Sequence, residues 1–377
     1  MSKHGPRSVL ARGLVMVLLA AGVPGLIISL AIPASAATNL AVTVIRPAAT
    51  PGPFQTFSEV TGVAHCPLSG GVQQLVAGGG VSLTFGADMA GNGNHVNGTE
   101  PNADGINDLT GTATGVIATN PAYWMAVGGS GGATETSFSD TPFAMCFTPN
   151  ASNGPIKSTD IVMNRVTGPL TASGVSLTVA TCPSGNRLLS GGARATPASR
   201  GSLKPVASYP TVSNSAHDFG AKASADGEIN PDSWAAWGLG GGPTQTMGQP
   251  DPITYAYAVC AKPKTTTSVT TTVRFTEVSG PTVATTGQFA TATCKSTDGG
   301  LAGGGAAISN GNVTTTDFNV TGSVGDHQTG SFPSDASGHP VVSGTASPTT
   351  WTAATHTGGV NSPNTFTDVW AMCAVTP

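Results

Sequence analysis

Six cysteines divide the chain into three similar parts. The pairs are Cys66 and Cys146, Cys182 and Cys260, and Cys294 and Cys373. Their members are 80, 78 and 79 positions apart. Such regular spacing is typical of an internal repeat, in which each copy is one structural unit. We therefore predict three tandem copies, which span residues 37–150, 151–262 and 263–377.

Two further landmarks recur between the cysteines of each copy. A glycine-rich turn is expected soon after the first cysteine, in the segments 75–80, 188–193 and 301–306. A proline followed by a tryptophan comes later, and the tryptophans are Trp124, Trp234 and Trp351. Their fixed place in every copy predicts core positions. A Gly-Pro pair also precedes the first cysteine at 168–169 and at 280–281, whereas we expect Pro51 to Pro53 of copy one to follow a different register.

The composition indicates strands rather than helices. Asp, Glu, Lys and Arg make up only 9% of the chain, which contains 51 Gly and 28 Pro. Long surface helices need charged residues on their exposed face, whereas Thr, Val, Gly and Asn are typical of strands and turns. We therefore expect an all-β fold of three tandem β-sandwich-like modules. Polar linkers at 148–159 and 262–272 predict modules that sit like beads, with modest contacts between them.

The first 36 residues have the features of a secretory signal peptide. Lys3, Arg7 and Arg12 precede the uncharged apolar stretch 13–31, and residues 34–36 form a small-residue cleavage site. We expect cleavage and a secreted, extracellular protein with no membrane attachment afterwards; a retained membrane anchor is the alternative. The mature chain then carries 12 Lys or Arg against 19 Asp or Glu. This acidic balance does not attract nucleic acid.

Cysteines of an exported protein are expected to be oxidised. Six cysteines allow about 15 pairings, and the repeat favours one bond inside each copy. A bond between neighbouring copies, such as Cys146 with Cys182, is the alternative. Closing a loop of about 80 residues stabilises a domain by roughly 4–5 kcal/mol.

The start of each copy carries a family resemblance. Copy two has Cys182-Pro183-Ser184-Gly185, copy one has one extra residue in 66–70, and in copy three Lys295 replaces the proline. With the glycine motif, the later Trp and a final Ala-x-Cys, this arrangement resembles tandem modules of uncharacterised secreted proteins from high-GC Gram-positive bacteria. The resemblance covers nearly the whole mature chain. It implies no catalytic residues, because those proteins have no assigned activity.

Residues with catalytic or metal-binding chemistry do not repeat. Ser130 lies in a G-x-S-x-G pattern, but no helix pattern follows it. We expect unrelated positions for the histidines, which include His65, His217, His327, His339 and His356. The sequence therefore predicts no enzyme, no cofactor and no metal. The Asn- and Asp-rich stretch 91–111 could place oxygens around calcium, although a solvated loop is the simpler interpretation.

One tryptophan has no counterpart in the other copies. Trp237 lies three residues after Trp234, so a regular strand would turn it to the opposite face. It is the candidate ligand-binding residue, with Tyr209 or Tyr255 as neighbours. We expect a non-catalytic structural or surface-interaction protein. The alternative is an extracellular carbohydrate- or cell-wall-binding protein, with a glycan or a protein as partner.

Overall fold

A computed structural model describes residues 38–376, except the segments 86–92, 133–136, 150–154, 198–202, 241–249, 266–267 and 321–324. The expected signal peptide lies outside the described residues. Residues Ala36–Pro377 form one compact unit, and its described part is all-β. A short 3-10 helix, η1 (Ser215–Gly220), interrupts the strands. None of the helices in the described part is long and apolar enough to span a membrane.

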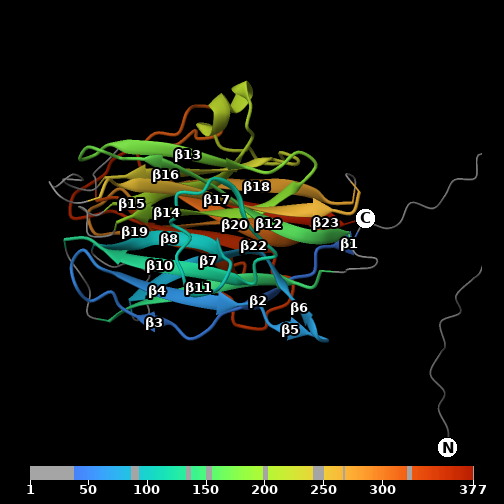
Figure 1. The fold of residues 1–377 in the computed structure, drawn as a ribbon. Coiled ribbons are helices and arrows are strands. Elements are labelled where there is room, and N and C mark those ends of the chain that lie inside the picture. The colour runs from blue at the N-terminus through green and yellow to red at the C-terminus, as the bar shows by residue number, and fades with distance from the viewer. Residues whose placement is uncertain are drawn as a thin grey trace, which may run out of the picture. The chain divides into compact units, whose positions relative to one another are not determined.

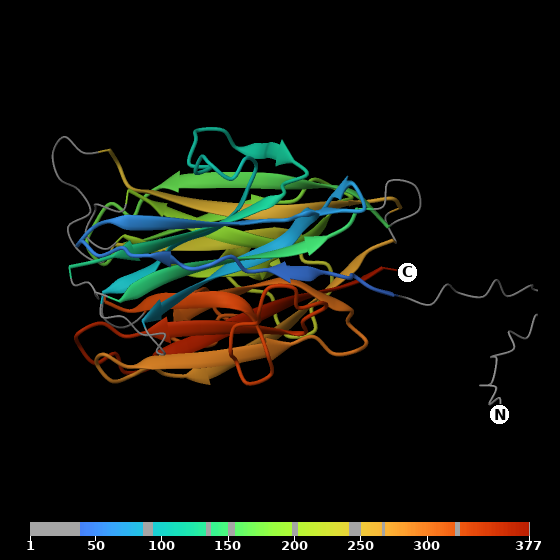
Figure 2. The same ribbon diagram turned by 90° about the horizontal axis from the view of Figure 1, so that it is seen from below.

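Three antiparallel seven-stranded sheets build the unit, and we name each after the two copies that supply its long strands (Figures 1 and 2). The 2–3 sheet has the order β1 (Thr38–Asn39), β23 (Phe366–Thr376), β20 (Gly300–Ser309), β15 (Lys204–Thr211), β16 (Ser233–Leu239) and β13 (Val175–Thr181), with β18 (Thr270–Ser279) on β23. The 1–2 sheet has the order β4 (Glu59–His65), β10 (Tyr123–Ser130), β8 (Asn94–Asn102), β14 (Arg187–Thr196), β17 (Ile253–Pro263), β12 (Ile156–Thr167) and β9 (Gly115–Thr119).

The 3–1 sheet has the order β19 (Gly287–Thr293), β22 (Thr350–His356), β21 (His327–Ser334), β7 (Leu75–Phe85), β11 (Phe138–Phe147) and β2 (Thr43–Ile45), with β3 (Thr50–Pro51) also on β11. A small separate hairpin joins β5 (Leu68–Ser69) to β6 (Val72–Gln73). The predicted all-β fold is confirmed.

The three copies close into a ring by sharing strand edges. β8 of copy one pairs with β14 of copy two, β15 of copy two with β20 of copy three, and β21 of copy three with β7 of copy one. The expectation of separate modules with modest contacts between them is therefore wrong. Parts of the expected polar linkers also belong to the sheets, because β12 begins at Ile156 and β18 at Thr270.

The glycine motif lies inside a strand beside a β-bulge, not in the expected turn. Its last glycine faces the neighbouring copy. A Cβ added there would lie about 2 Å from a backbone oxygen of that copy, a distance no packing can accommodate. The distances are 2.1 Å for Gly80 to Ser331, 1.9 Å for Gly192 to Thr99 and 2.2 Å for Gly305 to Ser208. In copy one the structural equivalents are shifted by one residue from the alignment of 75–80 with 188–193 and 301–306, because Cys146 pairs with Val76 whereas Cys260 and Cys373 pair with Leu188 and Leu301.

The preceding glycine of the motif lies under the recurrent tryptophan of its own copy. A Cβ on Gly79, Gly191 or Gly304 would lie 2.4, 2.2 or 2.4 Å from that indole. All three indoles are fully buried, as predicted: Trp124, Trp234 and Trp351. Their Nε1 atoms donate to hydroxyls on the strands that join the copies, Thr99, Ser208 and Ser331, at 2.8, 2.8 and 2.9 Å. Each tryptophan therefore links the core of its copy to a junction.

The residue before these two glycines is Gly78, Ser190 or Gly303, and it meets its equivalents at the centre of the ring. A Cβ on Gly78 would lie 2.5 Å from the Ala302 oxygen and 2.8 Å from Ser190 Cβ. A Cβ on Gly303 would lie 2.3 Å from Ser190 Oγ. One small side chain therefore fills the place where the three copies converge.

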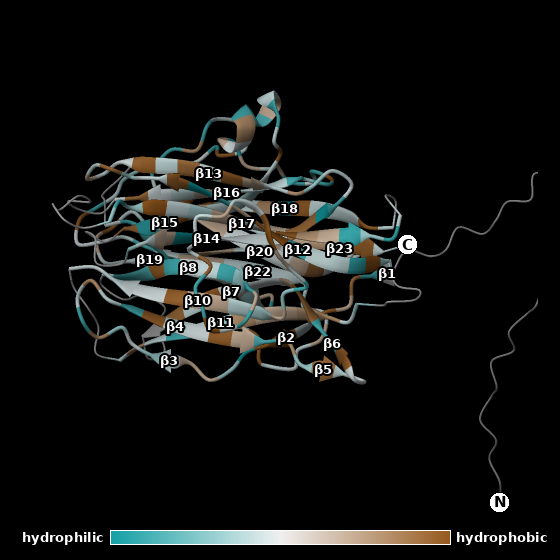
Figure 3. Cartoon of the chain, in the orientation of Figure 1, coloured by the Kyte–Doolittle hydropathy of each residue, from teal (hydrophilic) through white to brown (hydrophobic). Residues whose placement is uncertain are grey.

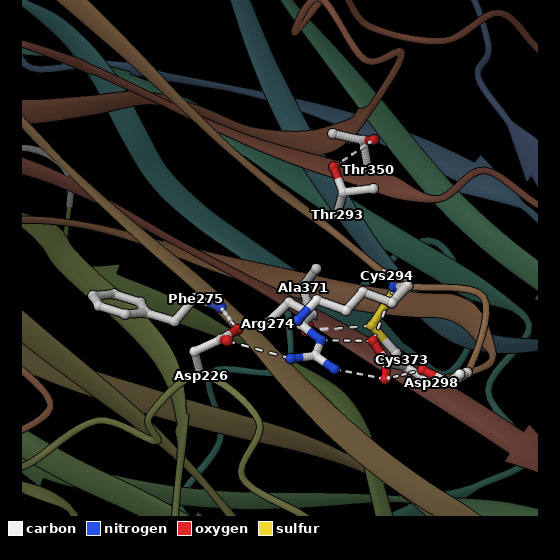
Figure 4. Close-up of a disulfide and its surroundings, with 11 residues drawn as sticks. Asp226, Arg274, Phe275, Thr293, Cys294, Asp298, Thr350, Ala371 and Cys373 are labelled. Carbon is white, nitrogen blue, oxygen red and sulfur yellow. Dashed lines mark hydrogen bonds and ion pairs between the residues drawn. A yellow bond between two sulfur atoms is a disulfide. The ribbon is translucent and has the colours of Figure 1, made fainter.

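Three disulfides join Cys66 to Cys146, Cys182 to Cys260 and Cys294 to Cys373. The predicted bond inside each copy is confirmed. Figure 4 shows the third bond beside Arg274, which Asp298 and Asp226 hold.

The expectation of a different register before Cys66 is wrong, because Gly52–Pro53 is a cis peptide at the position of Gly168–Pro169 and Gly280–Pro281.

The residue before the proline of the Pro-to-Trp motif clamps the next copy. Asn120 donates its N–H to the Thr159 oxygen at 2.6 Å, and its Oδ1 accepts from the Thr159 N–H at 3.1 Å. Asn230 makes the same two bonds with Thr271, at 2.8 and 3.0 Å. Both asparagines have φ near +53°, a left-handed conformation that Asn tolerates well.

Candidate interaction sites

A buried polar cluster lies where the three junction strands begin. His95, Lys204 and His327 each precede the hydroxyl that accepts from a tryptophan by four residues, so they are equivalent positions of the three copies. All three are buried. The centroids of the His95 and His327 rings are 6.2 Å apart, and those of His327 and His356 are 5.2 Å apart.

We call His95, Lys204 and His327 the axial cluster. Its two histidines are neutral. Nδ1 of His95 lies 3.1 Å from the Gly93 carbonyl, and Nδ1 of His327 lies 2.5 Å from the Gly325 carbonyl. Because a carbonyl only accepts, each Nδ1 carries the proton. Burial, and then the charge of Lys204, lowers the pKa of His95 to about 3 and that of His327 well below its usual value.

Burial also lowers the pKa of Lys204, to about 8, while the nearby Asp326 acts in the opposite direction. The cluster thus surrounds one buried ammonium with neutral imidazoles. Within the described ranges, no group of three or more His, Cys, Asp or Glu side chains is placed to hold a metal ion. This arrangement resists protonation of the histidines, because a second positive charge beside Lys204 would be buried.

The expectation of unrelated histidine positions is wrong for His327, which is equivalent to His95. A signal for this was present in the sequence. His95 and His327 each begin a His-x-x-Gly segment, followed by the Thr or Ser that accepts from tryptophan. Copy two has Lys204 and Ala207 at those places, which hides the pattern.

Trp237 is half-buried rather than freely exposed. Its Nε1 donates to the Tyr209 hydroxyl at 2.7 Å, and its ring packs on Phe318 with 5.2 Å between centroids. Of the two predicted neighbours of Trp237, Tyr209 is therefore the one that contacts it. Tyr255 lies on β17 of the 1–2 sheet and donates instead to the Thr110 carbonyl at 2.8 Å.

Trp237 and Trp234 lie on opposite faces of β16, as strand alternation predicts. Trp234 points to the interior of copy two, against Gly191, and Trp237 belongs to the face that carries Tyr209. Further aromatic rings extend this face, because Tyr209 lies 5.3 Å from Trp370, and Trp370 lies 5.1 Å from Phe275. The site is thus an aromatic layer of which Trp237 is a partly open member.

The stretch 91–111 is not a solvated loop over its whole length. Residues Asn94–Asn102 are the buried strand β8. In the loop that follows, Asn102 Oδ1 accepts from the N–H groups of Asp104 and Gly105, and Asp104 Oδ1 accepts from those of Ile106 and Asn107. These oxygens cap the loop's own backbone.

A buried ionic network crosses the junction of copies one and two, and sequence reasoning missed it. Arg194 of copy two contacts Glu59 at 2.6 and 2.9 Å and Asp108 at 3.0 Å. Glu100 lies beside them, and burial, followed by the charge of Asp108, raises its pKa well above the usual range. Its Oε1 accepts from the Leu109 N–H. The network holds a loop against the sheet.

The serine of the G-x-S-x-G pattern is also used structurally. Ser130 ends β10 and is buried, and its Oγ donates to the Gln55 carbonyl and accepts from the Ser58 N–H.

No protein-family model matches this chain, and no curated protein sequence matches it.

Proposed function

We propose that the mature chain is a secreted, non-catalytic structural or surface-interaction protein. One observation carries this proposal: the residues common to the three copies are used to build and close the ring. The cysteines form the disulfides, the glycines admit neighbouring strands and the tryptophans fill the cores. The N-terminal sequence and the disulfides support secretion.

The loops over the outer faces of the sheets differ between the copies, unlike the ring itself. Copy one has the capped loop after Asn102, copy two has η1, and copy three has a turn in which Asp335 accepts from the N–H groups of Ser337 and His339. Binding residues are commonly found on loops held by a rigid scaffold. A closed body with three different outer loops suits contact with other molecules at the cell surface.

The test is co-sedimentation of the oxidised mature protein with the insoluble cell-surface fraction of the producing organism. We expect saturable retention that is lost when the disulfides are reduced and the protein unfolds. Bovine serum albumin at the same concentration controls for trapping. Absence of retention, or turnover of a substrate that a single substitution abolishes, would contradict the proposal.

A glycan site at Trp237 is a second candidate. It is supported by the partly open indole, whose face lies beside Phe318 while its Nε1 is bonded to Tyr209. Aromatic faces combine apolar contact with a polar rim, as sugar recognition requires. Titration with cell-wall and plant polysaccharides should change the tryptophan fluorescence, and Trp237→Phe should weaken that binding. The exposed Phe289 of copy three supplies the matched control, Phe289→Ala. An unchanged titration with Trp237→Phe would remove this site.

A further inference from the structure

Each of the three sheets has one covered edge and one open edge. The covered edge is closed by a segment of the preceding copy: β9 pairs with β12, Ile229 bridges Thr272 of β18, and Ala346 bridges Thr43 of β2. The opposite edges are β4, β13 and β19. In the described part of the chain, no strand pairs with their outer sides. An open edge presents unpaired backbone groups to any strand that can reach it.

Hydrogen bonding shows which residues of β13 face outward. The Cys182 N–H donates to the Asp232 carbonyl at 2.8 Å, so every second residue back along β13 bonds to β16. The remaining residues present their N–H and C=O groups to the outside, and they are Val175, Leu177, Val179 and Thr181. The Asn164 side chain, which donates to the Val179 carbonyl at 2.9 Å, confirms this direction and leaves that oxygen a second lone pair.

β13 is the open edge best suited to pair with another strand. Its sequence, VSLTVAT, has no charge, no Gly and no Pro, and hydrophobic residues run along it in Figure 3. Val175 is 44% exposed. The equivalent edge β4 begins with Glu59, which is tied to Arg194, and β19 begins with Gly287. Charges and glycines of this kind discourage strand addition.

We propose that β13 binds the β13 edge of a second copy of this chain, antiparallel and about a two-fold axis. The 2–3 sheet would then continue from one molecule into the next. The strand is self-complementary in this arrangement, because Leu177 faces Val179 of the second molecule, Val175 faces its Thr181, and no charges oppose each other.

The chain's own construction supports a second copy as the occupant. Its repeats already associate by antiparallel pairing of strand edges, and copies three and one do so without a covalent link between them. Pairing at β13 would continue that interface mode along the 2–3 sheet. The inference rests on the proposed role as a structural or surface-interaction protein and names its partner.

Sedimentation of the oxidised mature protein over a range of concentrations tests the proposal. Val175→Glu with Leu177→Thr gives β13 the residues that copy one carries at the equivalent positions, Glu59 and Thr61. We expect a wild-type dimer whose dissociation constant rises at least tenfold in this variant. The control, Phe289→Thr on β19, should leave it within about twofold. If the double variant unfolds, Val175→Lys alone, at an exposed position, replaces it.

Backbone hydrogen exchange locates the contact. Exchange of 175–181 should slow as the protein concentration rises, while that of 59–65 and 287–293 should not change. A wild-type protein that stays monomeric at millimolar concentration, or a dimer that the β13 variant leaves intact, overturns the proposal and leaves this edge to a different partner. Retention on the cell-surface fraction by a monomer would keep the proposed function while removing this inference.

Discussion

The junction between copies one and two and the junction between copies three and one use the same short strand pairing but differ in their support. At the first, Arg194 of copy two bonds to Glu59 and Asp108 of copy one. At the second, Phe143 of copy one stacks on Phe332 of copy three, with centroids 6.0 Å apart. One junction therefore relies on buried charges and the other on apolar rings.

The two junctions also differ in covalent continuity. The chain runs directly from copy one into copy two, whereas copies three and one meet only through non-covalent contacts. The backbone contacts that close the ring include β1 on β23, β21 on β7, and the Ser347 N–H on the Val42 carbonyl at 2.8 Å. The comparison teaches that the strand pairing sets the geometry, while local side chains decide how firmly each junction holds. The closing junction should open first.

Adding a methyl group at either strand pairing should have the largest effect. The Cβ introduced by Gly192→Ala would lie 1.9 Å from the Thr99 oxygen, and that introduced by Gly80→Ala 2.1 Å from the Ser331 oxygen. Backbone cannot move away without breaking the sheet, so each variant should lose about 4 kcal/mol or more of unfolding free energy in urea. Gly111→Ala is the control, because nothing lies within 4 Å of its added Cβ. Losses below about 1 kcal/mol would show that the junctions are loosely packed.

Replacing one arginine at each junction should reveal how differently the two junctions are stabilised. Arg194→Ala removes a buried guanidinium and leaves the half-buried carboxylates of Glu59 and Asp108 without their partner, so we expect a loss of about 2 kcal/mol in urea unfolding. At the closing junction, Arg46 only lies over Phe143 at 5.5 Å and reaches the Val341 carbonyl at 3.4 Å. Arg46→Ala should cost less than about 1 kcal/mol. Equal losses would remove the distinction between a charged and an apolar junction.

Acid should weaken the ring through the axial cluster. Histidine titrates near 6.5 in the unfolded chain, while the folded pKa of His95 is about 3 and that of His327 lies well below its usual value. The unfolded state therefore binds more protons below about pH 6.5, and stability falls as the pH drops. Each histidine contributes up to about 1.4 kcal/mol per pH unit.

The measurement is the melting temperature of wild type and His327→Gln between pH 7 and pH 4. Asp140, whose pKa burial raises to about 8, acts in the opposite sense over this range but equally in both proteins. The difference between the two curves should therefore isolate His327, with the variant losing less stability on acidification. Parallel curves would mean that His327 takes up protons freely in the folded ring.

Sequence patterns predicted what lies inside one copy. The cysteine spacing gave the disulfides, and the recurrence of Trp124 and its equivalents gave the cores. The ring was not predicted, because Gly80 and its equivalents look the same in a turn and in a strand that another copy approaches. The axial cluster was missed for a related reason: His95 and Lys204 come together only when the junction strands meet.

The expectation for Trp237 was half correct. Strand alternation gave the right face and Tyr209 was the right neighbour, but the indole is partly covered by Phe318 of copy three. A residue from another copy cannot be placed before the pairing of the copies is known. The same limit applies to Arg194, whose partners lie in copy one.

The smallest predicted effect concerns the clamp at the closing junction. Asn120 and Asn230 each accept a backbone N–H of the next copy through Oδ1, whereas copy three has Ser347 at that place, with φ of 46°. Ser347→Asn should supply an oxygen for the Val42 N–H and suits the left-handed conformation better. We expect a gain of about 1 kcal/mol, measured as a higher melting temperature and slower proteolysis of the segments that form the closing junction. Asn230→Ser, the reverse change at the junction of copies two and three, should lose a similar amount. If Ser347→Asn gives no gain while Asn230→Ser costs stability, the closing junction does not adopt the clamp geometry of the other two.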